Sequence, residues 1–297
     1  MYTKIAIYLI LFALAALSVV YVVYQFTRPN EFLKNIYANP LAQGSRYIPK
    51  KIFQTVADKN KINWKFRENI QKIRKMNPGW EYTLMDDADI LEFIKRNYPQ
   101  SILDIYNKIN PEYGAARADF FRYLLIYKEG GVYLDIKSNM RIPLDMILRP
   151  DDQYLLTHWK RRNYSGLLGN TYGEFQQWQV IAAPGHPYLY RVIEEVINNI
   201  NNYDVQKTGV GKEAVLKVTG PIAYTRAIMP IQHKYPHREV VVHDDIGLIY
   251  SVIGDGFTHH VNLFSKPHYS KLKTPVVNKW MCIKSHSIIS VFNKNLI

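Results

Sequence analysis

The sequence predicts an α/β fold, and two observations support this. In the stretch 115–139, AARADFFRYLLIYKEGGVYLDIKSN, a helical pattern is followed by two glycines, a short apolar strand and an acid. Strand-like and helix-like segments then alternate along most of the 297 residues. With 47% hydrophobic and 21% charged residues, the chain is long enough to bury one sizeable core.

The stretch 115–139 carries its own folding signals. Apolar residues three and four apart give residues 115–128 one buried helical stripe. Gly130 and Gly131 then end this helix, because glycine adopts the left-handed conformation at little steric cost. The strand 132–134 ends at Asp135. Since ligands bind at the carboxyl ends of strands in open α/β sheets, we expect Asp135 to face a ligand.

Asp119 and Arg122 are three residues apart in the same helix, and Tyr123 is four from Asp119, so the three share a face. By itself, such an acid and base most often form a solvated ion pair.

The complete pattern resembles the sugar-nucleotide-binding core of glycosyltransferase family 32, the retaining enzymes that include fungal initiating mannosyltransferases. The large clostridial glucosylating toxins have a similar core. The family pattern is Ala-x-(Ser or Ala)-Asp-x-x-Arg-Tyr followed by Gly-Gly-x-Tyr-x-Asp-x-Asp. The matching residues are Ala116, Ala118, Asp119, Arg122, Tyr123, Gly130, Gly131, Tyr133 and Asp135. Residues 47–55, YIPKKIFQT, resemble the family's entry strand, and Lys137 stands where the family has its second acid.

The resemblance implies a GT-A type, Rossmann-like nucleotide-sugar-binding domain over residues 47–297. It also implies three catalytic residues: Asp135 bridging nucleotide and ion, and Asp119 with Arg122 holding sugar and phosphate. Residues expected to contact the donor are Gln54, Thr55, Tyr133 and Lys137. The implied cofactor is a divalent cation, Mn²⁺ or Mg²⁺, bound by Asp135 and His268.

Lys137 has two interpretations. Pointing into the site, its ammonium would pair with the donor's diphosphate and partly replace a metal ion. Pointing outward, it would leave the ion to Asp135 with Asn139 or His268. If the strand continues past Asp135, its period of two places residues 135 and 137 on one face and favours the inward orientation.

Three other features need less specific explanations. Asp86 precedes a helical stretch, and a helix cap is favoured over a place beside the donor. His186, before Pro187, is interpreted as a structural turn residue. The segment 166–175 contains three glycines and predicts a mobile loop near the acceptor.

The amino-terminal residues predict a membrane anchor. Residues 5–27 carry no charge and are long enough to cross a bilayer, although a cleaved signal peptide is the alternative. Residues 28–46 form a short connector to the domain. Family resemblance favours a Golgi-like type II orientation, whereas the basic residues after the span favour a cytosol-facing domain, so the orientation stays open.

Charge and cysteine content argue against a nucleic-acid-binding protein and against a disulfide-bonded domain. The net charge of +13 suits a phosphorylated substrate or an anionic membrane, but the basic residues are dispersed and form no nucleic-acid motif, so no nucleic-acid partner is expected. Cys282 is the single cysteine, which excludes an internal disulfide.

We therefore predict a membrane-anchored retaining glycosyltransferase. It would move mannose, galactose or glucose from a nucleotide sugar to a glycan or glycolipid acceptor. One alternative is an inactive glycan-binding protein on the same fold, suggested by Lys137. Another is a basic protein that binds a membrane surface or nucleic acid.

Overall fold

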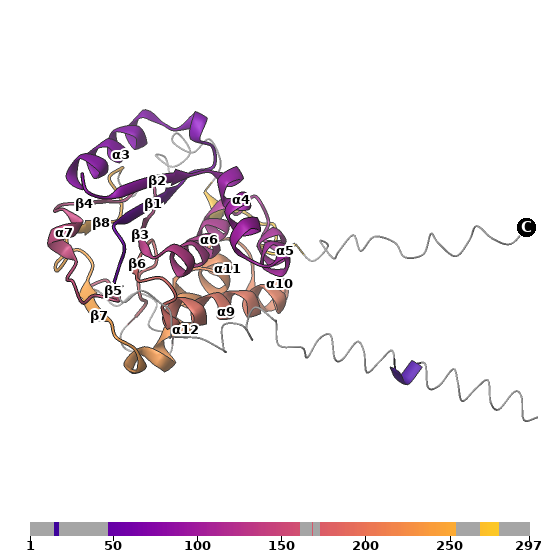
Figure 1. Ribbon diagram of the computed structural model, residues 1–297. Coiled ribbons are helices and arrows are strands. Elements are labelled where there is room, and N and C mark those ends of the chain that lie inside the picture. The colour runs from indigo at the N-terminus through magenta and orange to yellow at the C-terminus, as the bar shows by residue number, and fades with distance from the viewer. Residues whose placement is uncertain (1–14, 18–46, 161–167, 169–172, 254–267, 279–297) are drawn as a thin grey trace, which may run out of the picture. The chain divides into compact units, whose positions relative to one another are not determined.

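The computed structural model describes residues 15–17, 47–160, 168, 173–253 and 268–278 (Figure 1). Two compact units divide the chain, Met1–Gln43 and Gly44–Ile297, and the account below concerns the second. Within the described residues, no helix has the length and apolar character needed to cross a bilayer. Apart from residues 15–17, which are helical, the predicted span 5–27 and the connector 28–46 lie outside the described residues.

A six-stranded mixed sheet forms the centre of the second unit, in the order β2-β1-β3-β6-β5-β7. The strands are β1 (Lys51–Thr55), β2 (Glu81–Met85), β3 (Gly131–Leu134), β5 (Tyr154–His158), β6 (Gln179–Ala182) and β7 (Arg238–Val241). Strand β6 is antiparallel to both its neighbours, and every other adjacent pair is parallel. The carboxyl ends of five strands therefore share one edge, where β6 begins.

Helices and a small ribbon cover the two faces of the sheet (Figure 1). On one face lie α3 (Trp64–Met76), α7 (Leu144–Ile147) and the ribbon of β4 (Asn139–Met140) and β8 (Leu248–Ile249). The other face carries α6 (Gly114–Glu129), α9 (Pro187–Asn201), α11 (Gly211–Val218) and α12 (Pro221–Ile228). The remaining helical segments are α4 (Asp87–Asn97), α5 (Gln100–Lys108), α10 (Val205–Thr208), η1 (Lys59–Lys61), η2 (Met229–Lys234) and η3 (Tyr269–Lys271).

Helix α6 is more deeply buried than the sequence predicts. Every residue from Asp119 to Ile126 is buried, because α4, α9 and α11 pack around the helix as well as the sheet. The predicted single apolar stripe is therefore wrong, and Asp119 and Arg122 do not form the solvated ion pair that their spacing alone most often gives. A helix enclosed on all sides must satisfy its polar side chains internally.

The glycine pair and the turn after β3 set the position of Asp135. Gly130 and Gly131 have φ values of 65° and 97°, and a Cβ on Gly131 would lie 2.7 Å from the Lys51 carbonyl oxygen. After Leu134 the strand ends, and the Ser138 N–H donates to the Asp135 carbonyl at 2.8 Å. The strand does not continue to Lys137, so the premise behind the predicted inward orientation is wrong.

The cap predicted at Asp86 is confirmed, and His186, interpreted as a structural turn residue, caps a helix as well. The Asp86 carboxylate accepts from the backbone N–H groups of Ala88 and Asp89, forming a capping box at the start of α4. The His186 Nδ1 accepts from the Tyr188 N–H and caps α9.

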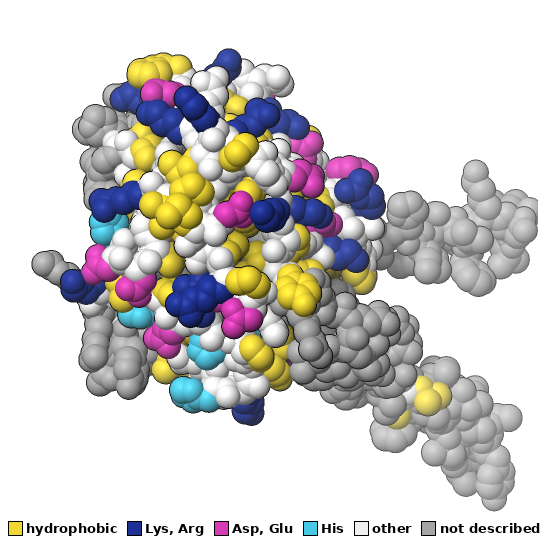
Figure 2. Space-filling model, turned by 60° about the vertical axis from the view of Figure 1, so that its left-hand side comes forward, with side chains coloured by type: hydrophobic (Ala, Val, Ile, Leu, Met, Phe, Trp, Pro, Cys, Tyr) yellow, Lys and Arg dark blue, Asp and Glu magenta, His cyan; other side chains and the backbone are white. Residues whose placement is uncertain are grey.

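The surface is mixed in charge on the face drawn in Figure 2. Lys and Arg side chains are spread over this face, with Asp and Glu between them.

Candidate functional site

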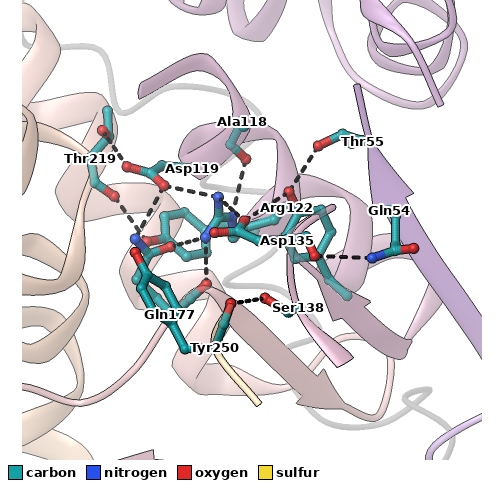
Figure 3. Close-up of polar contacts among 12 residues, drawn as sticks. Gln54, Thr55, Ala118, Asp119, Arg122, Asp135, Ser138, Gln177, Thr219 and Tyr250 are labelled. Carbon is teal, nitrogen blue, oxygen red and sulfur yellow. Dashed lines mark hydrogen bonds and ion pairs between the residues drawn. The ribbon is translucent and has the colours of Figure 1, made fainter. Parts of the chain in front are cut away.

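An ion-pair network lies at the carboxyl edge of β3 (Figure 3). The Arg122 Nη2 is 3.1 Å from Asp119 Oδ1 and 2.9 Å from Asp135 Oδ1, so one guanidinium joins two carboxylates. Asp119 and Arg122 are one helical turn apart on α6, and Asp135 follows β3. The double glycine between these elements brings the three side chains together.

Two residues from other parts of the chain complete the ion-pair network, which we define as Asp119, Arg122, Asp135, Gln177 and Thr219. The Gln177 side chain donates to Asp119 Oδ1 at 3.1 Å, and its Oε1 accepts from Arg122 Nη1 at 2.5 Å. The Thr219 hydroxyl donates to Asp119 Oδ2 at 3.1 Å. Both oxygens of Asp119 therefore have partners.

Burial divides the network into a fixed part and an accessible part. The exposed fractions of the Arg122 and Asp119 side chains are 3% and 6%, whereas that of Asp135 is 24%. Burial raises the pKa of Asp119, although Arg122 opposes this. Burial alone would lower the pKa of Arg122, but the charges of Asp135 and Asp119 raise it above its usual value. Asp135 is the acid of this network that a ligand can reach.

The predicted donor residues of β1 and β3 lie beside Asp135. The Tyr133 hydroxyl is 2.8 Å from Thr55 Oγ1 and donates to Asp135 Oδ1 at 3.4 Å. Gln54 donates to the Asp135 carbonyl oxygen at 3.0 Å and accepts from the Tyr82 hydroxyl at 2.8 Å. Gln54 and Tyr133 are buried, so these contacts fix the turn, and Thr55 is the more exposed of the three.

Lys137 lies against an aromatic ring. Its Nζ is 3.8 Å from the ring centroid of Tyr250, and its carbonyl oxygen accepts from the Val252 N–H. A cation over a ring face is stabilised by the ring's electrons.

Asn69 binds the turn that follows Asp135 through three hydrogen bonds. This buried residue of α3 donates to the carbonyl oxygens of Ile136 and Ser138 and accepts from Asn139. The three bonds lock residues 135–139 against α3. The Asn139 side chain therefore makes its hydrogen bonds to other residues of the fold, with its amide donating to Asn69 and its oxygen accepting from the Met140 N–H.

Comparison with known proteins identifies the motif. Residues 64–155 match the family described as the glycosyltransferase sugar-binding region containing the DXD motif. The resemblance to glycosyltransferase family 32 is confirmed. The match includes Asn69, Asp119, Arg122 and Asp135. Gln177 and Thr219 lie beyond it, so the ion-pair network extends outside the matched sugar-binding region.

Named relatives agree with this assignment. The chain is 28% identical over 206 residues to the initiation-specific alpha-1,6-mannosyltransferase of Schizosaccharomyces pombe, covering 61% of this chain and 48% of that protein. It is 31% identical over 209 residues to inositol phosphoceramide mannosyltransferase 3 of the same yeast, covering 70% and 51%. The chain thus spans about half the length of the curated relatives it matches.

The solved structures that match include the PaToxG glycosyltransferase. That match has 17% identity and a TM-score of 0.48, and covers 68% of this chain and 76% of that one.

DXD-containing glycosyltransferases generally use a divalent cation. Among the described residues of this sugar-binding region and its surroundings, no three His, Cys, Asp or Glu side chains converge as a metal-binding group. His268 caps η3, which packs on α11, and its Nδ1 accepts from the Ser270 N–H. Asp135 has one carboxylate oxygen outside the Arg122 contact. A single available carboxylate oxygen fits a metal ion that is also bound by a ligand's phosphates, as Mg²⁺ often is. It does not fit a site in which protein side chains supply all the metal ligands.

Sequence reasoning missed three side chains of the site. Thr219 opens a Thr-Gly-Pro turn, a local pattern that indicates a change of chain direction but not the role of the Thr219 side chain. Gln177 and Asn69 have no comparable local signal, because each meets its partner across 55 or more residues.

Proposed function

We propose that the protein transfers a hexose from a nucleotide sugar to a hydroxyl of a glycan or glycolipid, with retention of anomeric configuration. The observation that carries this proposal is the accessible Asp135 at the carboxyl edge of β3, held by a buried guanidinium. Two relatives are named mannosyltransferases, which favours mannose over galactose and glucose.

Asp135 is proposed to contact the donor. Its carboxylate is the partly exposed member of the ion-pair network. The Tyr133 hydroxyl contacts both this carboxylate and Thr55, so Thr55 lies close to Asp135. The polar atoms of Arg122 and Asp119 are buried and already paired within the fold, which supports a positioning role: the two residues fix the Asp135 carboxylate before the donor arrives.

We propose that a Mn²⁺ or Mg²⁺ ion binds only when the nucleotide sugar is bound. Asp135 would supply one oxygen, and the donor's phosphates and water would supply the others. Such an ion would help to neutralise the leaving diphosphate. His268 remains a candidate ligand from the sequence, and Lys137 is a second candidate source of positive charge.

The domain organisation and location are also proposed. Residues 5–27 would anchor the chain in a membrane as a single pass, residues 28–46 would connect, and residues 47–297 would form the transferase domain. The uncharged run of residues 5–27 supports the anchor. Its orientation is left open.

Donor hydrolysis tests the proposed function. The full chain in detergent is incubated with UDP- and GDP-hexoses, with and without Mn²⁺, and release of nucleoside diphosphate is measured. We expect slow release from one donor and its loss in Asp135→Ala. Asp151→Ala is the control, because the exposed Asp151 precedes β5 at the opposite edge of the sheet.

Release that is unchanged in Asp135→Ala would overturn the site assignment. Saturable donor binding without any release would instead favour the inactive glycan-binding alternative, which the lysine at position 137 suggests. No binding of any nucleotide sugar would overturn the proposed function.

A further inference from the structure

Three buried polar atoms of the described residues have no hydrogen-bond partner. They are Glu174 Oε2, Trp178 Nε1 and Gln179 Oε1, and all belong to one stretch of chain, which we call segment 174–179. The exposed fractions of these residues are 7%, 4% and 1%. An unpaired buried polar group costs roughly 1–3 kcal/mol, and native structures contain few of them. All three lie within six residues, so this segment has more unmet hydrogen-bonding capacity than the rest of the described chain.

Segment 174–179 crosses the same sheet edge as Asp135. It leads into β6, which begins where β3 and β5 end. The Asp135 N–H donates to the Trp178 carbonyl at 2.9 Å, and Gln177 accepts from Arg122 through both its carbonyl and its side-chain oxygen. A ligand bound along this segment would therefore lie next to the proposed donor site.

Aromatic rings flank the segment. Trp159, directly after β5, stacks on Trp178 with ring centroids 6.2 Å apart. Tyr250 packs edge-on against both, with centroids 5.9 Å and 5.5 Å away. Trp159 is only partly buried, so part of its surface is available. Aromatic surface with a few fixed polar groups is typical of small-molecule sites.

The unpaired atoms select the chemistry of the ligand. The carboxylate and amide oxygens accept hydrogen bonds, whereas the indole N–H donates one. A hydroxyl group both donates and accepts, so a polyhydroxylated ring can satisfy all three. A phosphate has oxygens that accept, and the Glu174 carboxylate would repel it. Gln176 fixes the other oxygen of Glu174 by donating to it at 3.2 Å.

We propose that segment 174–179 binds the hydroxyl-bearing ring of the acceptor beside Asp135, with Trp159 as a stacking face. This inference rests on the proposed function and assigns the acceptor side of that same site. Glu174 then contacts an acceptor hydroxyl directly, and Trp178 and Gln179 orient the ring. Burial raises the pKa of Glu174 to about 7, although hydrogen bonds to Gln176 and Trp159 oppose this, and a bound hydroxyl that donates to the carboxylate would oppose it further.

The test separates acceptor recognition from donor binding. The full chain and its Glu174→Gln variant are compared using methyl α-D-mannopyranoside and myo-inositol as acceptor probes. The initial rate of hexose transfer is measured against probe concentration, and the donor Kd is measured separately by calorimetry. We expect Glu174→Gln to raise the acceptor KM about tenfold or more, because a charged hydrogen bond is lost. The donor Kd should stay within about twofold.

Glu239→Gln is the matched control. Glu239 lies on neighbouring β7 with an exposed side chain, near His158 and Gln232, and makes no contact with segment 174–179 in the described part of the chain. This variant should change neither the acceptor KM nor the donor Kd. Trp178→Phe keeps the ring but removes the N–H, and it serves as the second variant if Glu174→Gln folds poorly.

An unchanged acceptor KM in folded Glu174→Gln or Trp178→Phe would overturn the inference while leaving the proposed function intact. If the wild-type chain turns over no nucleotide sugar, the proposed function fails instead. Binding of the two probes, followed by saturation-transfer NMR, then still tests the site: loss of their signal in Glu174→Gln supports it and retention contradicts it.

Discussion

The ion-pair network and segment 174–179 meet at the same edge of the sheet, but they differ in how many of their buried polar atoms have hydrogen-bond partners. In the network, each carboxylate oxygen of Asp119 and each nitrogen of Arg122 has a partner. In the segment, Gln177 belongs to that network, while three nearby side chains each leave an atom unpaired. Paired buried charge fixes a geometry, whereas each unpaired buried atom needs a further partner, which we propose is the acceptor.

The largest expected effect comes from breaking the network. Arg122→Ala leaves two carboxylates without their shared cation, and we expect it to lower the free energy of unfolding by about 3–5 kcal/mol. Urea unfolding followed by circular dichroism measures this. Arg191→Ala, which removes an exposed partner of Glu194, should change it by no more than about 0.5 kcal/mol. Equal effects of the two substitutions would contradict a structural role for the network.

A pH series sharpens the contrast for segment 174–179. Burial raises the pKa of Glu174 to about 7 in the folded chain from its ordinary value of 4.5. Between these two values the folded state binds more protons than the unfolded state, so stability falls as pH rises through this window. Glu174→Gln cannot titrate. Relative to wild type, it should therefore gain up to about 3 kcal/mol of stability between pH 4 and pH 8.

Unfolding curves of wild type and Glu174→Gln at both pH values give this difference, in which the other titrating groups largely cancel. The same relative stability at pH 4 and pH 8 would mean that Glu174 is not held in an unfavourable environment.

Removing the anchor of the Asp135 turn should have an intermediate effect. Asn69→Ala deletes three hydrogen bonds, two to the carbonyls of Ile136 and Ser138 and one from the Asn139 side chain. We expect a loss of about 1–3 kcal/mol in unfolding free energy together with weaker donor binding. The exposed Asn202→Ala should leave donor binding unchanged. A destabilised Asn69→Ala with wild-type donor affinity would show that the turn's position is not set from α3.

The smallest effect is expected where the two regions join. Lys137→Met keeps the aliphatic stem and removes the ammonium over Tyr250, for a loss of about 0.5–1 kcal/mol. Lys65→Met is the control, since Lys65 lies 5.8 Å from the ring centre of Trp64, which is 65% exposed. A smaller change is expected there. Thermal unfolding of both variants decides whether the Tyr250 contact holds Lys137.

Local chemistry made part of the site predictable. The glycine pair and the Asp86 cap depend on neighbouring residues, and the sequence shows both. The burial of α6 on all sides could not be predicted, because it is created by α4, α9 and α11, which lie elsewhere in the sequence. The turn at 135–138 replaced an expected strand, since period-two reasoning does not reveal where a strand stops.

The hydrogen-bond partners of Asp119 and Arg122 could not be predicted from neighbouring residues in the sequence either. Gln177 and Thr219 follow Asp119 by 58 and 100 residues, and amide and hydroxyl side chains are common in loops. The unpaired atom of Glu174 is visible only once the surrounding side chains are placed.

Donor affinity is the most direct test of the central claim that Asp135 and its buried partners form a nucleotide-sugar site. Isothermal titration of the full chain and of Asp135→Asn with the UDP- and GDP-hexoses measures it, because the substitution keeps the shape of the side chain and removes its charge. We predict saturable binding of one donor by the wild-type chain and at least about tenfold weaker binding by Asp135→Asn. Equal affinity of the two proteins for that donor would contradict the claim.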